Sequence, residues 1–403
     1  MDHFITYYNI DCPPGSVSAV LEDSIMHKGR PVTAGSKALE NFIAPLSATV
    51  AERLESAGVI ILGKTKMDEL GAAGLFPDTS PSESGAVSAV ADGTAAFALC
   101  NDYTGALRRQ AAAQGICCIR PTYGTVSRYG LIPSVPSMDQ IGVLCKTPEE
   151  GFRALSLIAG HDPKDGAMFG RGEPGEGRGE RREERGETPK GAGRSDGSDE
   201  QYTCNVQMGA VRTERIRLGI PLNTLEGAAD KAAVAEYAKD FDTLEFELKY
   251  FDVFAQVMRI LCCAELSACI SRYDGIKYGY RTGSFGDLHE LYTKSRTEAF
   301  GGDTKLAAIM GCMTLSREYY ARYYDKAMRI RRLIRDALEF DKYDAIIMPA
   351  SASTHDGQLA LGALPQLCGL PSVTLPFSGG GITLIADTAR ENVLFNHLRK
   401  VCL

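Results

Sequence analysis

Residues 48–62 have the sequence ATVAERLESAGVIIL, and this stretch decides the fold class because a helical pattern passes directly into a strand pattern. The segment Ala48–Leu54 places its apolar side chains at helical spacing, and Gly58 is typical of the residue that follows a helix. The run Val59–Leu62 is wholly apolar and mostly β-branched, which is typical of a strand buried on both faces. A helix followed by a buried strand indicates an α/β protein.

The same order recurs further along the chain. Thr147 and Pro148 predict a capped helix that begins at this proline and runs to Gly160. A long charged helix is predicted over 317–340, and the apolar run Tyr343–Pro349 after it is predicted to be a buried strand. We therefore expect an α/β fold with helices on both faces of the sheet.

One segment differs in kind from the rest of the chain. Residues 170–200 contain 16 charged residues and nine glycines and almost no apolar side chain. Such a segment cannot offset its ordering entropy by burial, so we expect a disordered insertion. Its charges are seven positive and nine negative, so we interpret it as a solvated linker rather than a basic arm for nucleic acid. The insertion divides the chain into residues 1–169 and 201–403.

Composition limits the classes of function. The chain has 403 residues and a net charge of −7, which argues against a dominant phosphate-binding surface, and we expect no direct binding of nucleic acid. We expect no apolar stretch to approach the length of a membrane span and find no secretory signal at Met1, so we expect a cytoplasmic protein without membrane contact. The 12 cysteines show no Cys-x-x-Cys spacing and the six histidines no His-Glu-x-x-His, so we expect neither a metal site nor a cofactor.

The stretch Gly58–Thr65 satisfies the spelling of a phosphate-binding loop, G-x-x-x-x-G-K-T. A phosphate-binding loop is a turn whose backbone N–H groups converge on the anion. Here the variable residues are Val, Ile, Ile and Leu, which form the predicted strand. We therefore reject a nucleotide-binding site at this position.

Several longer motifs occur in a fixed order and together are specific. They are His27–Gly29, Ser36–Phe42, Gly63–Glu69, Arg120–Leu131, Met138–Gly142, Gly160–Asp165, Ser271–Gly279, Glu290–Tyr292 and Ser295–Gly301. On these motifs the chain resembles the amidase signature family, and within it the A subunit of the tRNA-dependent glutamine amidotransferases. The resemblance covers most of the chain outside the insertion. It implies a single α/β domain with a mixed, twisted central sheet between helices.

The resemblance also implies a catalytic machinery of a lysine base, a relay serine in a cis peptide and a nucleophilic serine. By the flanking text, Glu22 stands where the family has the lysine, and Ser82 retains the relay hydroxyl. Ala106 stands where the family has the nucleophile. Alanine has no hydroxyl, so no acyl-enzyme can form at this position. We expect Glu22 to be a solvated carboxylate or a partner of Arg108 or Arg109.

The binding positions implied by the resemblance also differ from the family pattern. The former oxyanion loop is Tyr103, Thr104 and Gly105, with Thr104 in place of a glycine. The arginine pair expected to hold a glutamine carboxylate falls on Leu306 and Ala307, and the acidic residue expected to recognise the amine falls near Leu359. We therefore expect the substrate pocket to be altered as well.

Two functions follow from these positions. The first is a pseudo-amidase, impaired in hydrolysis, that acts as a structural or regulatory partner of an amidotransferase B-type subunit or of an intact A-type subunit. The second is an active amide hydrolase or amidotransferase subunit with rewired residues, in which Ser82, Ser84 or Thr104 is the nucleophile and Glu22 the base.

Overall fold

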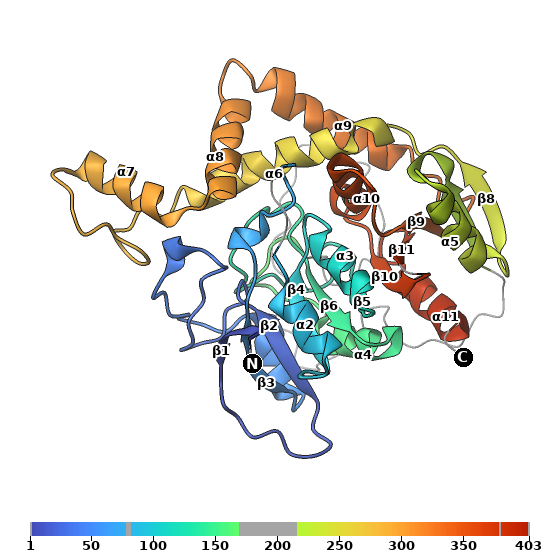
Figure 1. Ribbon diagram of the computed structural model, residues 1–403, viewed down its shortest axis with the longest axis horizontal. Helices are drawn as coiled ribbons and strands as arrows, with labels where there is room; N and C mark the ends of the chain where they lie inside the picture. The colour runs from blue at the N-terminus through green and yellow to red at the C-terminus, as the bar shows by residue number, and fades with distance from the viewer. Residues whose placement is uncertain (1, 78–81, 169–215, 379, 402–403) are drawn as a thin grey trace, which may run out of the picture.

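The computed structural model describes residues 2–77, 82–168, 216–378 and 380–401 (Figure 1). The predicted disordered insertion at 170–200 lies outside the described residues. Within the described residues, the strands form one sheet of 11 strands in the order β1-β3-β2-β4-β6-β5-β10-β11-β9-β7-β8. The strands are β1 (Phe4–Tyr7), β2 (Ser18–Glu22), β3 (Ile60–Thr65), β4 (Phe97–Asn101), β5 (Cys117–Arg120), β6 (Ile141–Cys145), β7 (Arg217–Pro221), β8 (Asp242–Phe246), β9 (Ala345–Pro349), β10 (Ser372–Phe377) and β11 (Gly380–Ala386).

The sheet is mixed, as the resemblance implies. Strand β2 is parallel to β3 and β4, and β7 is parallel to β8 and β9, whereas the other neighbours are antiparallel. Strand β5 pairs with β10, with Ile119 opposite Val373, so strands from both sides of the insertion belong to one sheet. The expected α/β class with a central sheet between helices is confirmed.

Eleven α-helices surround the sheet within the described residues (Figure 1). They are α1 (Thr49–Ser56), α2 (Gly85–Ala91), α3 (Ala106–Ala113), α4 (Pro148–Ile158), α5 (Ala228–Ala238), α6 (Phe254–Ile270), α7 (Leu288–Ala299), α8 (Gly302–Leu315), α9 (Lys326–Asp336), α10 (His355–Cys368) and α11 (Glu391–Val401). In Figure 1, α7 and α8 project from the body of the molecule, and α6 runs from them towards α10.

Apolar side chains of the central strands point alternately to the two faces of the sheet and pack against the helices on both faces. Val20 and Ala98 face the cluster that contains α2, whereas Leu21 and Leu99 face the cluster that contains α1 and α4. Successive side chains of a strand point to opposite faces, so every residue of β4 is buried. This double burial explains why the central strands are continuously apolar in sequence.

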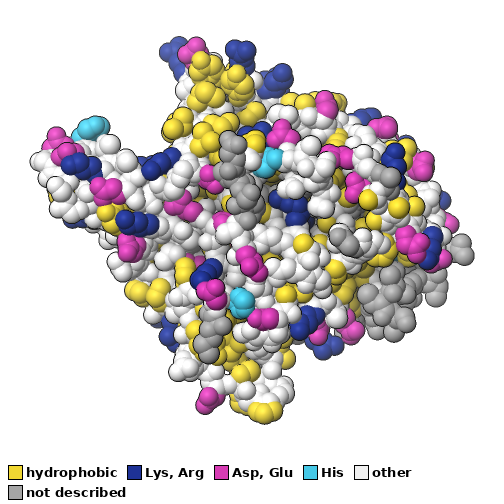
Figure 2. Space-filling view, viewed as in Figure 1, with side chains coloured by type: hydrophobic (Ala, Val, Ile, Leu, Met, Phe, Trp, Pro, Cys, Tyr) yellow, Lys and Arg dark blue, Asp and Glu magenta, His cyan; other side chains and the backbone are white. Residues whose placement is uncertain are grey.

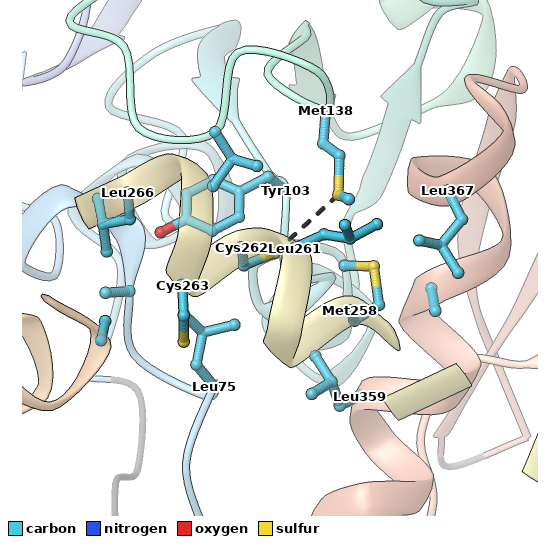
Figure 3. Close-up of a cluster of buried hydrophobic side chains, with 14 of the residues drawn as sticks. Leu75, Tyr103, Met138, Met258, Leu261, Cys262, Cys263, Leu266, Leu359 and Leu367 are labelled. Carbon is cyan, nitrogen blue, oxygen red and sulfur yellow. Dashed lines mark hydrogen bonds between the residues drawn. The ribbon is translucent and has the colours of Figure 1, made fainter. Parts of the chain in front are cut away.

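Helix α6 is the centre of a third cluster of buried side chains (Figure 3). Together with the turn before it, the segment Phe251–Ile270 spans 20 residues with a mean hydropathy of 1.7, enough by length and composition to cross a membrane. The expectation that no stretch approaches this length was therefore wrong. About 67% of an 18-residue window of this segment is buried inside the protein, as is usual for a core helix, and the segment includes the charged residues Asp252, Arg259 and Glu265.

The local predictions are mostly confirmed. The predicted helix at 48–54 is α1, the predicted strand at 59–62 is β3, and Tyr343–Pro349 contains β9. Thr147 caps α4 through a capping box, with Pro148 as its first residue. These elements were predictable because their signals lie within the elements or directly beside them.

The long helix predicted over 317–340 is shorter than expected. It opens with a π-helical turn, η5 (Ala321–Asp325), in which the Asp325 N–H donates to the carbonyl of Tyr320. The regular part, α9, ends at Asp336. Beyond it the chain turns, and Phe340 packs edge-on against Tyr343 with ring centroids 5.4 Å apart, just before strand β9.

Candidate functional site

The candidate site lies where parallel strands β2 and β4 end side by side. Glu22 is the last residue of β2, and Asn101 is the last residue of β4. A carboxyl oxygen of Glu22, Oε2, accepts a hydrogen bond of 2.7 Å from the backbone N–H of Asn101. This bond places Glu22 beside the loop 102–105, which leads into α3. The structure therefore brings two of the predicted segments together, although 79 residues separate them.

Glu22 does not lie in solvent and does not pair with arginine, so both expectations for this residue were wrong. Its side chain is only 1% exposed, because it lies at the interior end of a central strand. Arg108 instead donates to Asp102, and Arg109 donates to the carbonyl of Gln358 in α10. The pKa of Glu22 is raised to about 8, chiefly by burial and in smaller part by the negative charge of Asp102, while the Asn101 N–H and Lys64 oppose the rise. This carboxyl group therefore retains its proton at neutral pH.

A second buried ionisable group, Lys64, lies on the neighbouring strand β3. Its ammonium group donates to the carbonyl of Ile25 and lies 3.8 Å from the carboxylate of Asp23. Burial lowers the pKa of Lys64 to about 8, while the acidic side chains of Asp23 and Glu22 oppose this shift. Lys64 was not singled out from the sequence as a buried ionisable residue. Its position directly after an apolar strand pattern could have indicated burial, but this lysine was considered only as part of a possible phosphate-binding loop. Because Gly63, Lys64 and Thr65 are all in β3, the rejection of that loop is confirmed.

The predicted nucleophile position, Ala106, is the first residue of α3. Gly105 before it adopts a left-handed conformation, with φ of +82°, and turns the chain into the helix. The backbone N–H of Ala106 donates to the Thr104 hydroxyl at 3.3 Å. The next two amides, those of Leu107 and Arg108, donate to the Asp102 carboxylate. The first amides of the helix are thus already bound to side chains of this chain.

Gly105 and Gly362 allow the loop before α3 to pack directly against α10. A Cβ atom on Gly105 would lie 2.9 Å from the Cα atom of Gly362, and one on Gly362 would lie 2.7 Å from the carbonyl oxygen of Thr104. These are backbone atoms, so no side chain can rotate away. The loop predicted to be the former oxyanion loop is therefore fixed between the sheet and α10.

We expect Gly105→Ala to destabilise the protein much more than a matched glycine substitution. Gly29 also has a positive φ, +74°, but a Cβ there meets nothing within 4 Å. Gly29→Ala should therefore lower the free energy of unfolding by about 1 kcal/mol, the cost of the left-handed backbone alone. Gly105→Ala should lower it by roughly 1–3 kcal/mol more, because the loop or α10 must shift. Chemical denaturation of both variants measures this difference, and equal losses would contradict the close packing.

Tyr103, the first residue of the predicted oxyanion loop, belongs to the hydrophobic core. Its ring lies against α6, and it belongs to the same cluster of buried side chains as Leu75 and Met138 (Figure 3). Its hydroxyl group donates to the carbonyl of Leu70 at 2.9 Å. Since the side chain is buried and its hydroxyl is bound, Tyr103 anchors the loop and does not present a free reactive group.

Ser82 lies beside α3, but its hydroxyl group points elsewhere. The Gln110 side chain, one helical turn beyond Ala106, donates to the backbone carbonyl of Ser82. The Ser82 hydroxyl and backbone N–H both bind the carboxylate of Asp68, at 2.5 and 3.1 Å. The peptide bond before Ser82 joins it to Pro81, which lies outside the described residues. The hydroxyl of Ser84 is buried and has no hydrogen-bond partner among the described residues.

The three residues at the predicted substrate positions lie in different surroundings. Leu306 is exposed on α8, Ala307 is buried against the core, and Leu359 is buried in α10. None of them carries a polar side-chain group for a carboxylate or an amine. In the part of the chain that the structure describes, no group of three or more His, Cys, Asp or Glu side chains is arranged to hold a metal ion.

Comparisons with known proteins agree with the fold and with the motifs. The amidase family model matches residues 16–183 and 205–362, and the chain therefore belongs to the amidase signature family. It is 35% identical to the A subunit of the glutamyl-tRNA(Gln) amidotransferase of Lachnoclostridium phytofermentans, over 91% of this chain and 76% of that protein. It is 31% identical to the corresponding protein of Trichodesmium erythraeum, over 94% of this chain and 82% of that protein.

Solved structures of the family share the architecture. The crystal structure of the glutamyl-tRNA(Gln) amidotransferase A subunit from Thermotoga maritima superposes with a TM-score of 0.67 and 22% identity, covering 98% of this chain and 85% of that chain. The peptide amidase of Stenotrophomonas maltophilia gives a TM-score of 0.69 and 23% identity, covering 94% of this chain and 80% of that chain. At these identities the likeness concerns the fold alone.

Proposed function

We propose that this protein is a pseudo-amidase that acts as a structural or regulatory partner of a tRNA-dependent amidotransferase subunit. The observation that supports it most strongly is the start of α3. Ala106 offers a methyl group at the predicted nucleophile position, and its N–H, which would face an oxyanion, is bound to Thr104. In this proposal Glu22 stands at the position of the family's lysine base, Ser82 at that of the relay serine and Ala106 at that of the nucleophilic serine.

The arrangement of the other two positions supports the same proposal. A serine relay needs a neutral amine or another base in contact with its hydroxyl. Here the Ser82 hydroxyl binds Asp68, while the buried carboxyl group of Glu22 binds a backbone amide. The similarity to proteins named as the A subunit of glutamyl-tRNA(Gln) amidotransferase supports an amidotransferase subunit as the partner. We propose that this partner is a B-type subunit or an intact A-type subunit.

One observation favours the alternative of a rewired hydrolase. The hydroxyl of Ser82 lies 2.5 Å from the carboxylate of Asp68, and a serine in contact with a carboxylate is a candidate nucleophile with a base. The common use of such a contact is to stabilise a turn, because serine hydroxyls often bind nearby groups in loops. The alternative predicts turnover that depends on Ser82.

The proposed partnership can be tested by reconstitution. We expect the full-length protein, mixed with the purified B subunit of the amidotransferase from the same organism, to elute as one complex in size-exclusion chromatography with light scattering. The intact A subunit from that organism is mixed with the protein in a parallel experiment. Separate elution of this protein from both subunits at micromolar concentration would contradict the proposed partnership.

A further inference from the structure

Helix α8 is apolar on both of its faces. One face packs against α6 and contains the buried residues Thr304, Ala307, Gly311 and Thr314. The contact is so close that a Cβ atom on Gly311 would lie 2.1 Å from the backbone oxygen of Cys263. This face of α8 is therefore fully occupied by the protein's own core.

The opposite face of α8 is an exposed apolar stripe. Leu306, Ile309 and Met313 follow each other at helical spacing and are 42%, 68% and 40% exposed. Leu315 and Tyr320 extend the exposed apolar surface towards the turn η5. Figure 2 shows hydrophobic side chains gathered over this projecting part of the molecule. A helix that is apolar all round is normally covered on all sides, so this stripe has the character of an interface.

The charge around the stripe is opposite in sign to that of the whole chain. Residues 305–335 contain eight basic and two acidic residues, whereas the chain has a net charge of −7. Within the described residues, Arg317, Arg322 and Lys326 are exposed and form no ion pair with a carboxylate. Unpaired positive charge at the rim of an apolar stripe complements a partner with acidic residues beside an apolar face.

The turn that contains Arg322 and lies between Arg317 and Lys326 has an unusual backbone. It is the π-helical segment η5, and π-helical turns occur frequently at functional sites. Its aromatic rings brace it, since Tyr320 and Tyr324 lie 5.3 Å apart by ring centroid. The basic side chains are thus presented from an ordered corner of the molecule.

We propose that the stripe Leu306–Ile309–Met313 and the basic side chains at and beside η5 (Arg317, Arg322 and Lys326) form the docking surface for an acidic amphipathic helix of the partner subunit. Helices recognised through one apolar face present side chains at this same spacing, and flanking charges set their orientation. The inference rests on the proposed function, because it takes the partner to be an amidotransferase subunit. It adds which face of the protein makes the contact and the chemistry that the partner presents there.

The test uses the full-length protein and the purified B subunit, with binding measured by isothermal titration calorimetry. Ile309→Glu should weaken binding by more than about tenfold, because it places a charge at the centre of the stripe. Leu222→Glu is the matched control: Leu222 is 39% exposed, on η3 (Leu222–Thr224) at the end of β7, and its substitution should leave binding unchanged. Arg322→Glu should weaken binding and reduce its dependence on salt concentration.

Each outcome separates the docking surface from the partnership itself. A complex that Ile309→Glu weakens and Leu222→Glu does not supports the proposal. A complex that both variants form as tightly as the wild type overturns the docking surface and leaves the proposed function standing. If the wild type binds neither the B subunit nor the intact A subunit, both the docking surface and the proposed function are overturned; if it binds only the intact A subunit, the same variants are compared in that complex. If the wild type self-associates and Ile309→Glu abolishes this, the stripe is a contact with a second copy of the chain, and the proposal of an acidic partner is overturned.

Melting curves of Ile309→Glu and Leu222→Glu check that both variants fold. Ile309→Ala repeats the binding measurement without an added charge.

Discussion

We expect the purified protein to release no ammonia from glutamine or from simple amides. Loss of the serine nucleophile alone typically lowers turnover by about six orders of magnitude, which places hydrolysis below detection. Ala106 has no hydroxyl group to form an acyl-enzyme, and its backbone N–H is bound to Thr104. The protonated carboxyl group of Glu22 cannot accept the serine proton that a neutral lysine accepts. The measurement is ammonia release over hours at micromolar protein, for the chain alone and in complex with the B subunit.

The control variant for this measurement is Ser82→Ala. If the protein hydrolyses amides and Ser82→Ala abolishes the activity, the rewired hydrolase is correct and the pseudo-amidase is wrong. If activity persists in that variant, Ser84→Ala and Thr104→Val test the remaining hydroxyl groups near α3. An active amidase of the family, assayed in parallel, sets the level of detection.

The fold was predictable from the sequence wherever the signals are local. The capping box of Thr147, the apolar face of α1 and the buried run of β3 each lie within one short segment. Their structure is therefore decided by helix-capping, periodicity and burial, which a single sequence displays. The mixed character of the sheet is different: only the resemblance implied it, because strand order is set by pairings between distant segments.

The environment of the site residues was not predictable in the same way. Glu22 was expected in solvent or beside an arginine, and it lies buried on the N–H of Asn101. This contact follows from the parallel pairing of β2 with β4, which joins segments far apart in the sequence. The hydrogen bond from the Ala106 N–H to the Thr104 hydroxyl forms across the left-handed turn at Gly105. Sequence motifs located these positions, but only three-dimensional packing defines their partners and their protonation.

The buried carboxyl group of Glu22 should make the stability of the protein depend strongly on pH. Its pKa is about 8 in the folded protein and ordinarily 4.5. Between these values the folded protein binds more protons than the unfolded chain, so the free energy of unfolding falls as the pH rises. From pH 5 to pH 8 we expect a loss on the order of 3 kcal/mol from this one group.

Glu22→Gln isolates this effect, because glutamine keeps an acceptor for the Asn101 N–H but does not titrate. The variant should match the wild type near pH 5 and exceed it in stability at pH 8 by on the order of 3 kcal/mol. Lys64 is present in both proteins, and its lowered pKa of about 8 makes stability rise with pH only above that value. Glu247→Gln, at an exposed position, should keep the pH dependence of the wild type. Chemical denaturation from pH 5 to pH 8 measures how the free energy of unfolding depends on pH in the wild type and in the two variants. If Glu22→Gln shows the same pH dependence as the wild type, the Glu22 carboxyl group is ionised in the folded protein throughout this range.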